Sequence, residues 1–181
     1  MRMGHPVLRT VAQPLSSDDF GSDWLRSLVT DMIETLHDYG GIGLAAPQIG
    51  ESVRVAIIEI EGGPTRYGDL PAVPLTAFVN PEIDIVSDST AGYWEGCLSV
   101  PGLRGFVERP QHIRVDYLDL NGERCALELT GFLATVFQHE FDHLDGRLYL
   151  DRLSDPRLLA FEDEYVRYLM PREEEEIENS V

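Results

Sequence analysis

The chain has 181 residues, of which 43% are hydrophobic and 25% are charged, so it is long enough for one globular core and unlike a disordered protein. All 14 basic residues are arginine and 32 residues are acidic; the net charge of −18 argues against direct binding of nucleic acid or of a membrane surface. The sequence contains no run of about 18 apolar residues, so it predicts no membrane span. The two cysteines are far apart in the sequence, which is typical of a protein in a reducing compartment. We therefore expect one cytoplasmic domain over residues 1–181.

The first half of the chain predicts a helix followed by short strands. Ser22 can cap a helix in which apolar residues recur at helical spacing as far as Tyr39, and the glycines at 40–41 end it. The segment 61–74 contains glycine and proline and predicts a surface loop. Three segments rich in β-branched or apolar residues predict strands, and they are residues 53–60, 75–80 and 82–86.

A β-hairpin and a second helix follow. The segments 112–118 and 124–129 flank Asn121 and Gly122, a pair that favours a tight turn, so we expect these segments to form an antiparallel hairpin. The second helix is expected over residues 132–144. It carries more apolar positions than a surface helix needs, which predicts that it is central and buried.

The end of the chain predicts a third helix over residues 156–170, followed by an acidic tail at 171–181 that is expected to fray into solvent. Short strands around one buried helix differ from a regular alternation of strands and helices. The pattern therefore predicts the α+β class, with short antiparallel strands packed around a central buried helix.

The motif with the clearest chemistry lies on this buried helix. His139 and His143 are four residues apart, so a helix brings both imidazoles to one face, where they can bind one cation. Glu140 follows the first histidine, as does the proton-transferring glutamate of the HExxH arrangement. The alternative is that these are ordinary polar residues of a helix, but unpaired histidine and glutamate are costly in a core. The motif therefore predicts a catalytic metal.

Two histidines leave the metal short of a ligand. Downstream, the spacing for a third histidine holds Tyr149 instead, and Glu162 and Glu164 lie in an acidic run typical of a solvated face. Upstream, Cys97 follows Gly96 and offers a thiolate, although a lone cysteine is more often a small buried residue. The residues alone leave the third ligand open.

Three segments together resemble the signature motifs of peptide deformylases, in the order of that family. They are GIGLAAPQ at 41–48, EGCLS at 95–99 and QHEFDHL at 138–144. The opening at 4–15 is also similar to the start of that family, and the similarity covers residues 4–153. One such motif would be weak evidence, whereas three in order are specific.

The resemblance implies three metal ligands, which are Cys97, His139 and His143. It makes Glu140 the catalytic acid and base. The side chain of Gln48 and the backbone N–H of Leu98 would stabilise the oxyanion that develops on the substrate. Three protein ligands leave one metal position open for water, as a catalytic site requires.

The resemblance also assigns residues around the metal. Four match positions that line or bind the peptide, and they are Ile42, Gly43, Gly96 and Arg104. Thr135 and Val136, one turn before His139, match the pocket for the methionine side chain. Asp142 and Arg109 match supporting positions and are expected to form an ion pair.

The implied reaction is metal-dependent removal of the N-formyl group from formylmethionine at the start of newly made polypeptides. Activated water attacks the formyl carbon, and formate is released. The implied cofactor is one divalent ion per chain, Fe²⁺ in the cell, with Zn²⁺, Ni²⁺ or Co²⁺ as other occupants. Some family members dock on the ribosome through a basic C-terminal helix. Residues 151–181 hold ten acidic and four basic residues here, so a transient ribosome contact would need another mode.

Two alternatives stand beside this interpretation. An HExxH zinc peptidase would share the two histidines and Glu140 but would take its third ligand from downstream. A structural zinc module would close a site of four ligands, which are Cys97, Cys125, His139 and His143. Its cysteines lack the usual short spacing, and Glu140 would have no role in it.

Overall fold

The computed structural model describes residues 1–65 and 68–170. Its α-helices are α1 (Asp23–Tyr39), α2 (Ala46–Ile49), α3 (Phe132–Leu144) and α4 (Glu162–Glu164), and α4 continues into a π-helical turn at Tyr165–Leu169. Short 3₁₀ helices lie at Pro6–Arg9, Tyr149–Arg152 and Pro156–Leu158. The strands are β1 (Gly43–Ala45), β2 (Val55–Ile60), β3 (Gly63–Thr65), β4 (Gly68–Leu70), β5 (Val73–Ile85), β6 (Thr90–Cys97), β7 (Val100–Pro110), β8 (His112–Leu118), β9 (Arg124–Thr130) and β10 (Leu159–Phe161). None of the described helices is long and apolar enough to cross a membrane.

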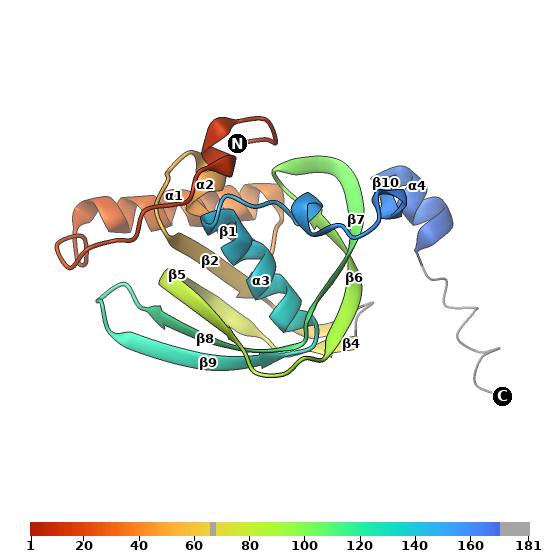
Figure 1. The fold of residues 1–181 in the computed structure, drawn as a ribbon. Helices are drawn as coiled ribbons and strands as arrows, with labels where there is room; N and C mark the ends of the chain where they lie inside the picture. The colour runs from red at the N-terminus through yellow and green to blue at the C-terminus, as the bar shows by residue number, and fades with distance from the viewer. Residues whose placement is uncertain (66–67, 171–181) are drawn as a thin grey trace.

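A five-stranded antiparallel sheet, in the order β1-β2-β5-β8-β9, lies between α1 and α3 (Figure 1). Alternate residues of a strand point to opposite faces, and β2 shows the result. Val55 and Ile57 pack in the cluster that holds the apolar residues of α1. Ala56, Ile58 and Ile60 pack in the cluster that holds those of α3. The sheet is therefore covered on both faces at this strand.

The helix α3 lies between that sheet and a second antiparallel sheet of order β10-β7-β6 (Figure 1). Eleven of its thirteen residues are buried. Ala134, Phe137 and Phe141 pack into the core against the five-stranded sheet. On the other side, His139 and Asp142 form hydrogen bonds with side chains of β6 and β7. One face of α3 thus builds the core, and the opposite face carries polar groups.

The predicted first helix and first strand are confirmed. The Ser22 hydroxyl accepts a hydrogen bond from the backbone N–H of Leu25 at 3.1 Å and so caps α1. Gly40 ends the helix in the left-handed region, at a φ of +68°. The strand predicted at 53–60 is β2, which begins two residues later.

The segment after β2 differs from the prediction. The expected loop at 61–74 contains β3 and β4, which pair as a small hairpin. The two strands expected at 75–86 are one strand, β5, whose pairing with β8 shifts register between Val79 and Glu82. Pro81 lies in that interval and has no N–H for the ladder, which explains why the sequence resembles two strands.

The sequence pattern predicts the hairpin of β8 and β9 and misses that of β6 and β7. The first is confirmed, although only Gly122 of the Asn-Gly pair has a positive φ, at +83°. The strands β6 and β7 contain glycines, which weaken the intrinsic strand signal. One of them is required by packing, because a Cβ at Gly105 would lie 2.8 Å from the ring of Tyr149.

The predicted helix at 156–170 is wrong over its first half. Residues 156–158 form a short 3₁₀ helix, and β10 then pairs antiparallel with β7, so α-helical structure begins only at Glu162. The outer edge of β7 offers hydrogen-bonding groups that this segment uses in place of helical ones. The expected fraying at 171–181 lies outside the described residues. The mixed class with antiparallel sheets is confirmed.

Candidate metal centre

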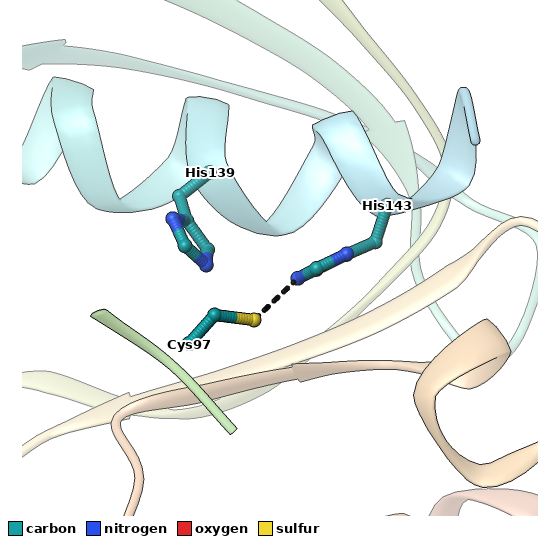
Figure 2. Close-up of side chains that lie close together, drawn as sticks. All are labelled: Cys97, His139 and His143. Atoms are coloured by element: carbon teal, nitrogen blue, oxygen red, sulfur yellow. Dashed lines mark hydrogen bonds between the residues drawn. The ribbon is translucent and has the colours of Figure 1, made fainter. Parts of the chain in front are cut away.

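Three potential metal ligands from two elements meet beside α3. Cys97 ends β6, and His139 and His143 leave one face of α3 a turn apart (Figure 2). Their ligand atoms all lie within 4.8 Å of one another, and the Cys97 Sγ is 3.3 Å from the His143 Nε2. The structure therefore brings together the three residues that the sequence singled out as ligands.

The position of Cys97 follows from a tight connection between β6 and β7. Cys97 pairs with Val100 across the turn, after an irregularity in register that follows Glu95. The backbone N–H of Ser99 donates a hydrogen bond to the Cys97 Sγ at 3.4 Å. Such a hydrogen bond stabilises a thiolate, the form of cysteine that binds metals.

A buried carboxylate that the sequence interpretation did not assign orients the first histidine. The Glu95 Oε2 is 2.7 Å from the His139 Nδ1, which leaves the Nε2 of that ring for a metal. Arg109 donates to both oxygens of Glu95, at 2.6 and 3.0 Å, and to Asp142 at 2.8 Å. The predicted pair of Arg109 and Asp142 is therefore present, and Arg152 adds a further contact to Asp142 at 2.5 Å. Glu95 lies in the same EGCLS motif as Cys97, and this position was the sequence signal that could have indicated its role.

The charged groups of this centre shift one another's pKa. Burial would raise the pKa of the Cys97 thiol, but the charge of His143 and hydrogen bonds from both histidines hold this pKa well below its usual range. Burial would lower the pKa of His139, but hydrogen bonds with Cys97 and Glu95 raise it well above the usual value. A thiolate and a buried carboxylate thus favour positive charge at His139, and a divalent cation would replace the proton there.

Glu140 lies at the same centre, pressed against β1. It is 6% exposed, and its Oε2 has no hydrogen-bond partner among the described residues. Burial raises the pKa of this carboxyl group. A Cβ at Gly43 would lie 2.6 Å from the Glu140 carboxyl carbon, so only glycine fits there. An unpartnered, buried carboxylate beside three ligand atoms is suited to bind a proton that moves during a reaction.

Gln48 approaches the centre from α2. Its Oε1 accepts a hydrogen bond from the backbone N–H of Ala45 at 2.8 Å, which fixes which end of the amide points inward. Its Nε2 donates to the Ser99 hydroxyl at 3.2 Å and is 3.7 Å from the Cys97 Sγ. The donor end of Gln48 is therefore held next to a metal ligand. The sequence interpretation did not assign Ser99.

A pocket of about 570 Å³ opens onto this centre. The six residues predicted to contact the peptide all line it, and they are Ile42, Gly43, Gly96, Arg104, Thr135 and Val136. Gln48, Leu98 and Glu140 line it as well. Arg109 and Asp142 do not, since they form the buried ion pair behind His139.

The residues of the alternative sites lie elsewhere. Cys125 is in β9, paired with Tyr117, and does not belong to the ligand cluster, so the structural site of four ligands does not form. Glu162 is also outside the cluster and forms an ion pair with Arg104. The described residues around the centre thus leave it with three protein ligands.

The sequence and the fold match known proteins. A model of the polypeptide deformylase family matches residues 1–158. The chain belongs to the polypeptide deformylase family. The peptide deformylase of Leptospira biflexa serovar Patoc is 40% identical over 164 residues, 91% of this chain and 92% of the relative. Peptide deformylase 1 of Bordetella pertussis is 49% identical over 155 residues, 86% of each chain.

Solved deformylase structures share the architecture. A class I type b peptide deformylase from Acinetobacter baumannii, bound to Met-Ala-Ser, matches with a TM-score of 0.78 at 40% identity, over 84% of this chain and 95% of that chain. A peptide deformylase from Synechococcus elongatus in complex with actinonin matches with a TM-score of 0.76 at 33% identity, over 94% of this chain and 85% of that chain. The chain is therefore an enzyme of a metal-dependent hydrolase family that acts in N-terminal processing.

The ligand atoms of Cys97, His139 and His143 suit a divalent transition metal. Two imidazoles and a thiolate suit Zn²⁺ and the neighbouring divalent transition metals. The contact from Glu95 to His139 is the usual outer partner of a metal-bound histidine. The His143 Nδ1 and the Glu140 Oε2 are buried without partners among the described residues.

Replacing Glu95 with glutamine should weaken metal binding by about 10- to 100-fold, because the neutral amide no longer raises the basicity of His139. Metal retention during titration with a chelator measures this effect. Asp142→Asn is the matched comparison, since it disturbs the ion pair with Arg109 but does not touch His139. Equal metal affinity in Glu95→Gln and the unaltered protein would contradict the role assigned to Glu95.

Proposed function

We propose that the chain hydrolyses the N-formyl group from the N-terminal formylmethionine of newly made polypeptides and releases formate. The observation that carries this proposal is the three-ligand cluster, two of whose members, Cys97 and His139, line the pocket. Glu140 also lines the pocket, and the donor end of Gln48 lies next to Cys97. The family supports the proposal, because its members act on formylated nascent peptides.

A divalent ion held by Cys97, His139 and His143 would act as a Lewis acid and lower the pKa of a water molecule in the pocket. The ligand types suit iron, zinc, nickel and cobalt alike. We propose Fe²⁺ in the cell, with Zn²⁺, Ni²⁺ or Co²⁺ as other occupants in preparations. A thiolate ligand beside Fe²⁺ makes oxygen sensitivity the expected consequence.

Glu140 is proposed to move the protons. Its carboxylate accepts a proton from the attacking water and later donates it to the departing amine of the methionine. Burial raises the pKa of Glu140, and the charge of a bound cation would lower it. The contact with Gly43 holds the carboxylate in place.

The oxyanion that forms on the formyl group needs hydrogen-bond donors. We assign this task to the Gln48 Nε2 and to the backbone N–H of Leu98, which follows Cys97 directly. Ala45 holds the Gln48 amide in the required orientation before substrate arrives. Donors fixed in this way need no reorganisation during the reaction.

The pocket suits the start of a peptide. Thr135 and Val136 of α3 line the part assigned to the methionine side chain. Gly43 and Gly96 have no side chains, so a substrate backbone can approach closely. Ile42 and Arg104 are assigned to the peptide that follows the methionine. The proposed partners are formylated nascent chains in the cytoplasm. A transient ribosome contact would need a mode other than a basic C-terminal helix, because residues 151–181 are acidic.

The peptidase alternative is not favoured. It needs a downstream ligand, and Glu162 contacts Arg104 instead of the ligand cluster. Cys97 occupies that role from upstream. Cys97 lies on the turn that also carries the backbone N–H of Leu98. A metal held by Cys97 would therefore lie next to a hydrogen-bond donor for the oxygen of a small carbonyl group.

Formate release from formyl-Met-Ala-Ser tests the proposal. The protein is prepared anaerobically, its bound metal is measured, and portions are loaded with Fe²⁺, Ni²⁺, Co²⁺ or Zn²⁺. We expect formate from the iron and nickel forms and cleavage of neither acetyl-Met-Ala-Ser nor Met-Ala-Ser. The product, Met-Ala-Ser, is the peptide bound in the Acinetobacter baumannii relative. An absence of formate with every metal, or cleavage of the unblocked peptide, would refute the proposed function.

A further inference from the structure

The last described segment reaches the substrate pocket through β10. This strand lies along the outer edge of β7, beyond which α4 begins (Figure 1). The register pairs Ala160 with Arg104 and Phe161 with Leu103. Glu162 follows immediately and lines the pocket together with Arg104. A residue 58 positions away in sequence is thereby held beside an arginine that is assigned to the peptide.

Arg104 is confined on two sides. Its Nε donates a hydrogen bond to the Glu162 Oε1 at 3.1 Å, and its Nη2 contacts the same oxygen. On its other side the guanidinium lies on Gly96, where a Cβ would be 2.6 Å from the Arg104 Cζ. The two charged side chains are 25% and 44% exposed. The pair is thus part of the pocket wall and still open to a ligand.

The pair determines the charge of this wall. An unpaired arginine would attract acidic side chains of a bound peptide and repel basic ones. Because the Glu162 Oε1 takes both contacts from Arg104, the carboxylate cancels that charge while part of it remains exposed to the pocket. Partly exposed charges have modest effects on stability, but they act on every charged substrate that binds nearby.

We propose that Glu162 is a specificity-determining residue for the substrate positions that follow the methionine. It neutralises Arg104, so that the enzyme accepts nascent chains with a basic side chain at these positions and does not select only those with an acidic one. The inference rests on the proposed function, since it concerns the peptide of the same reaction. It assigns a substrate-selecting role to the segment that β10 attaches to β7.

Glu162→Gln removes the charge with little change in shape. The probes are four amidated peptides, formyl-Met-Ala-Lys, formyl-Met-Lys-Ala and their two counterparts with glutamate in place of lysine. We expect the ratio of kcat/KM for lysine peptides to that for glutamate peptides to fall about fivefold or more in the variant. The change should appear mainly in KM and shrink at high salt, because it arises from charge. Glu162→Asp should recover part of the ratio.

Two further variants separate a local effect from a general one. Asp163→Asn removes the same charge from the next, exposed residue and should leave the ratio within about twofold. Arg104→Gln should raise the ratio, since it leaves Glu162 unpaired. Equal shifts in Glu162→Gln and Asp163→Asn, or an unchanged ratio in Glu162→Gln, would overturn this inference alone. An absence of formate from all four peptides with unaltered protein would overturn the proposed function and this inference with it.

Discussion

Formate release should fall by at least about 100-fold when Glu140 is replaced by glutamine, with the metal still bound. The carboxylate is buried in the pocket, has an unpartnered oxygen and a raised pKa, and is the group proposed to accept and return the proton. Glutamine keeps the shape that fits against Gly43 but cannot take up a proton at neutral pH. Initial rates with formyl-Met-Ala-Ser, normalised to bound metal, measure the effect.

The control for Glu140 is a second acidic residue outside the pocket. Glu128 in β9 is largely exposed, so Glu128→Gln should retain activity and metal. Metal content separates the two ways in which Glu140→Gln can lose activity. A variant with full metal content and nearly full activity would rule out the proton-transfer role of Glu140. A variant that loses its metal would instead make Glu140 part of the binding site.

Replacing Cys97 with serine should remove both metal retention and formate release. Serine offers a hydroxyl, whose proton is far harder to remove than that of a thiol with a strongly lowered pKa. Removing a residue that hydrogen-bonds to a metal ligand typically costs about 10- to 100-fold in metal affinity. Removing the ligand itself should cost at least as much. Metal per chain after gel filtration and after chelator titration gives the measurement.

Cys125 provides the matched control for this experiment. It is the other cysteine of the chain, partly buried in β9 and outside the ligand cluster. Cys125→Ser should therefore bind metal and release formate as the unaltered protein does. If Cys125→Ser loses its metal, a structural site with both cysteines becomes the better explanation. If Cys97→Ser keeps its metal, Cys97 is not a ligand and the assignment is wrong.

The parts of the fold that the sequence predicts depend on nearby residues. The cap at Ser22 and the stop at Gly40 are local, and α1 begins and ends where they place it. The helix α3 is a similar case, because four-residue spacing places His139 and His143 on one face of any helix.

The parts that the sequence misses depend on strand pairing. Glycines weaken the signal of β6 and β7, and their stability comes from pairing with each other and from cover by α3. The segment at 156–161 is predicted as helix, but its residues 159–161 pair with the edge of β7. A free strand edge can override a weak helical preference, since it offers hydrogen bonds over several residues.

For the candidate site, the sequence predicts which residues carry the chemistry. The spacing of the histidines indicated a metal, and the resemblance of three motifs supplied Cys97 and Gln48. The folded structure was needed to show which distant groups meet them, such as Glu95 at His139 and Glu162 at Arg104. Spacing within one helix fixes the relative directions of its side chains, whereas contacts between separate strands depend on register and packing across the whole molecule.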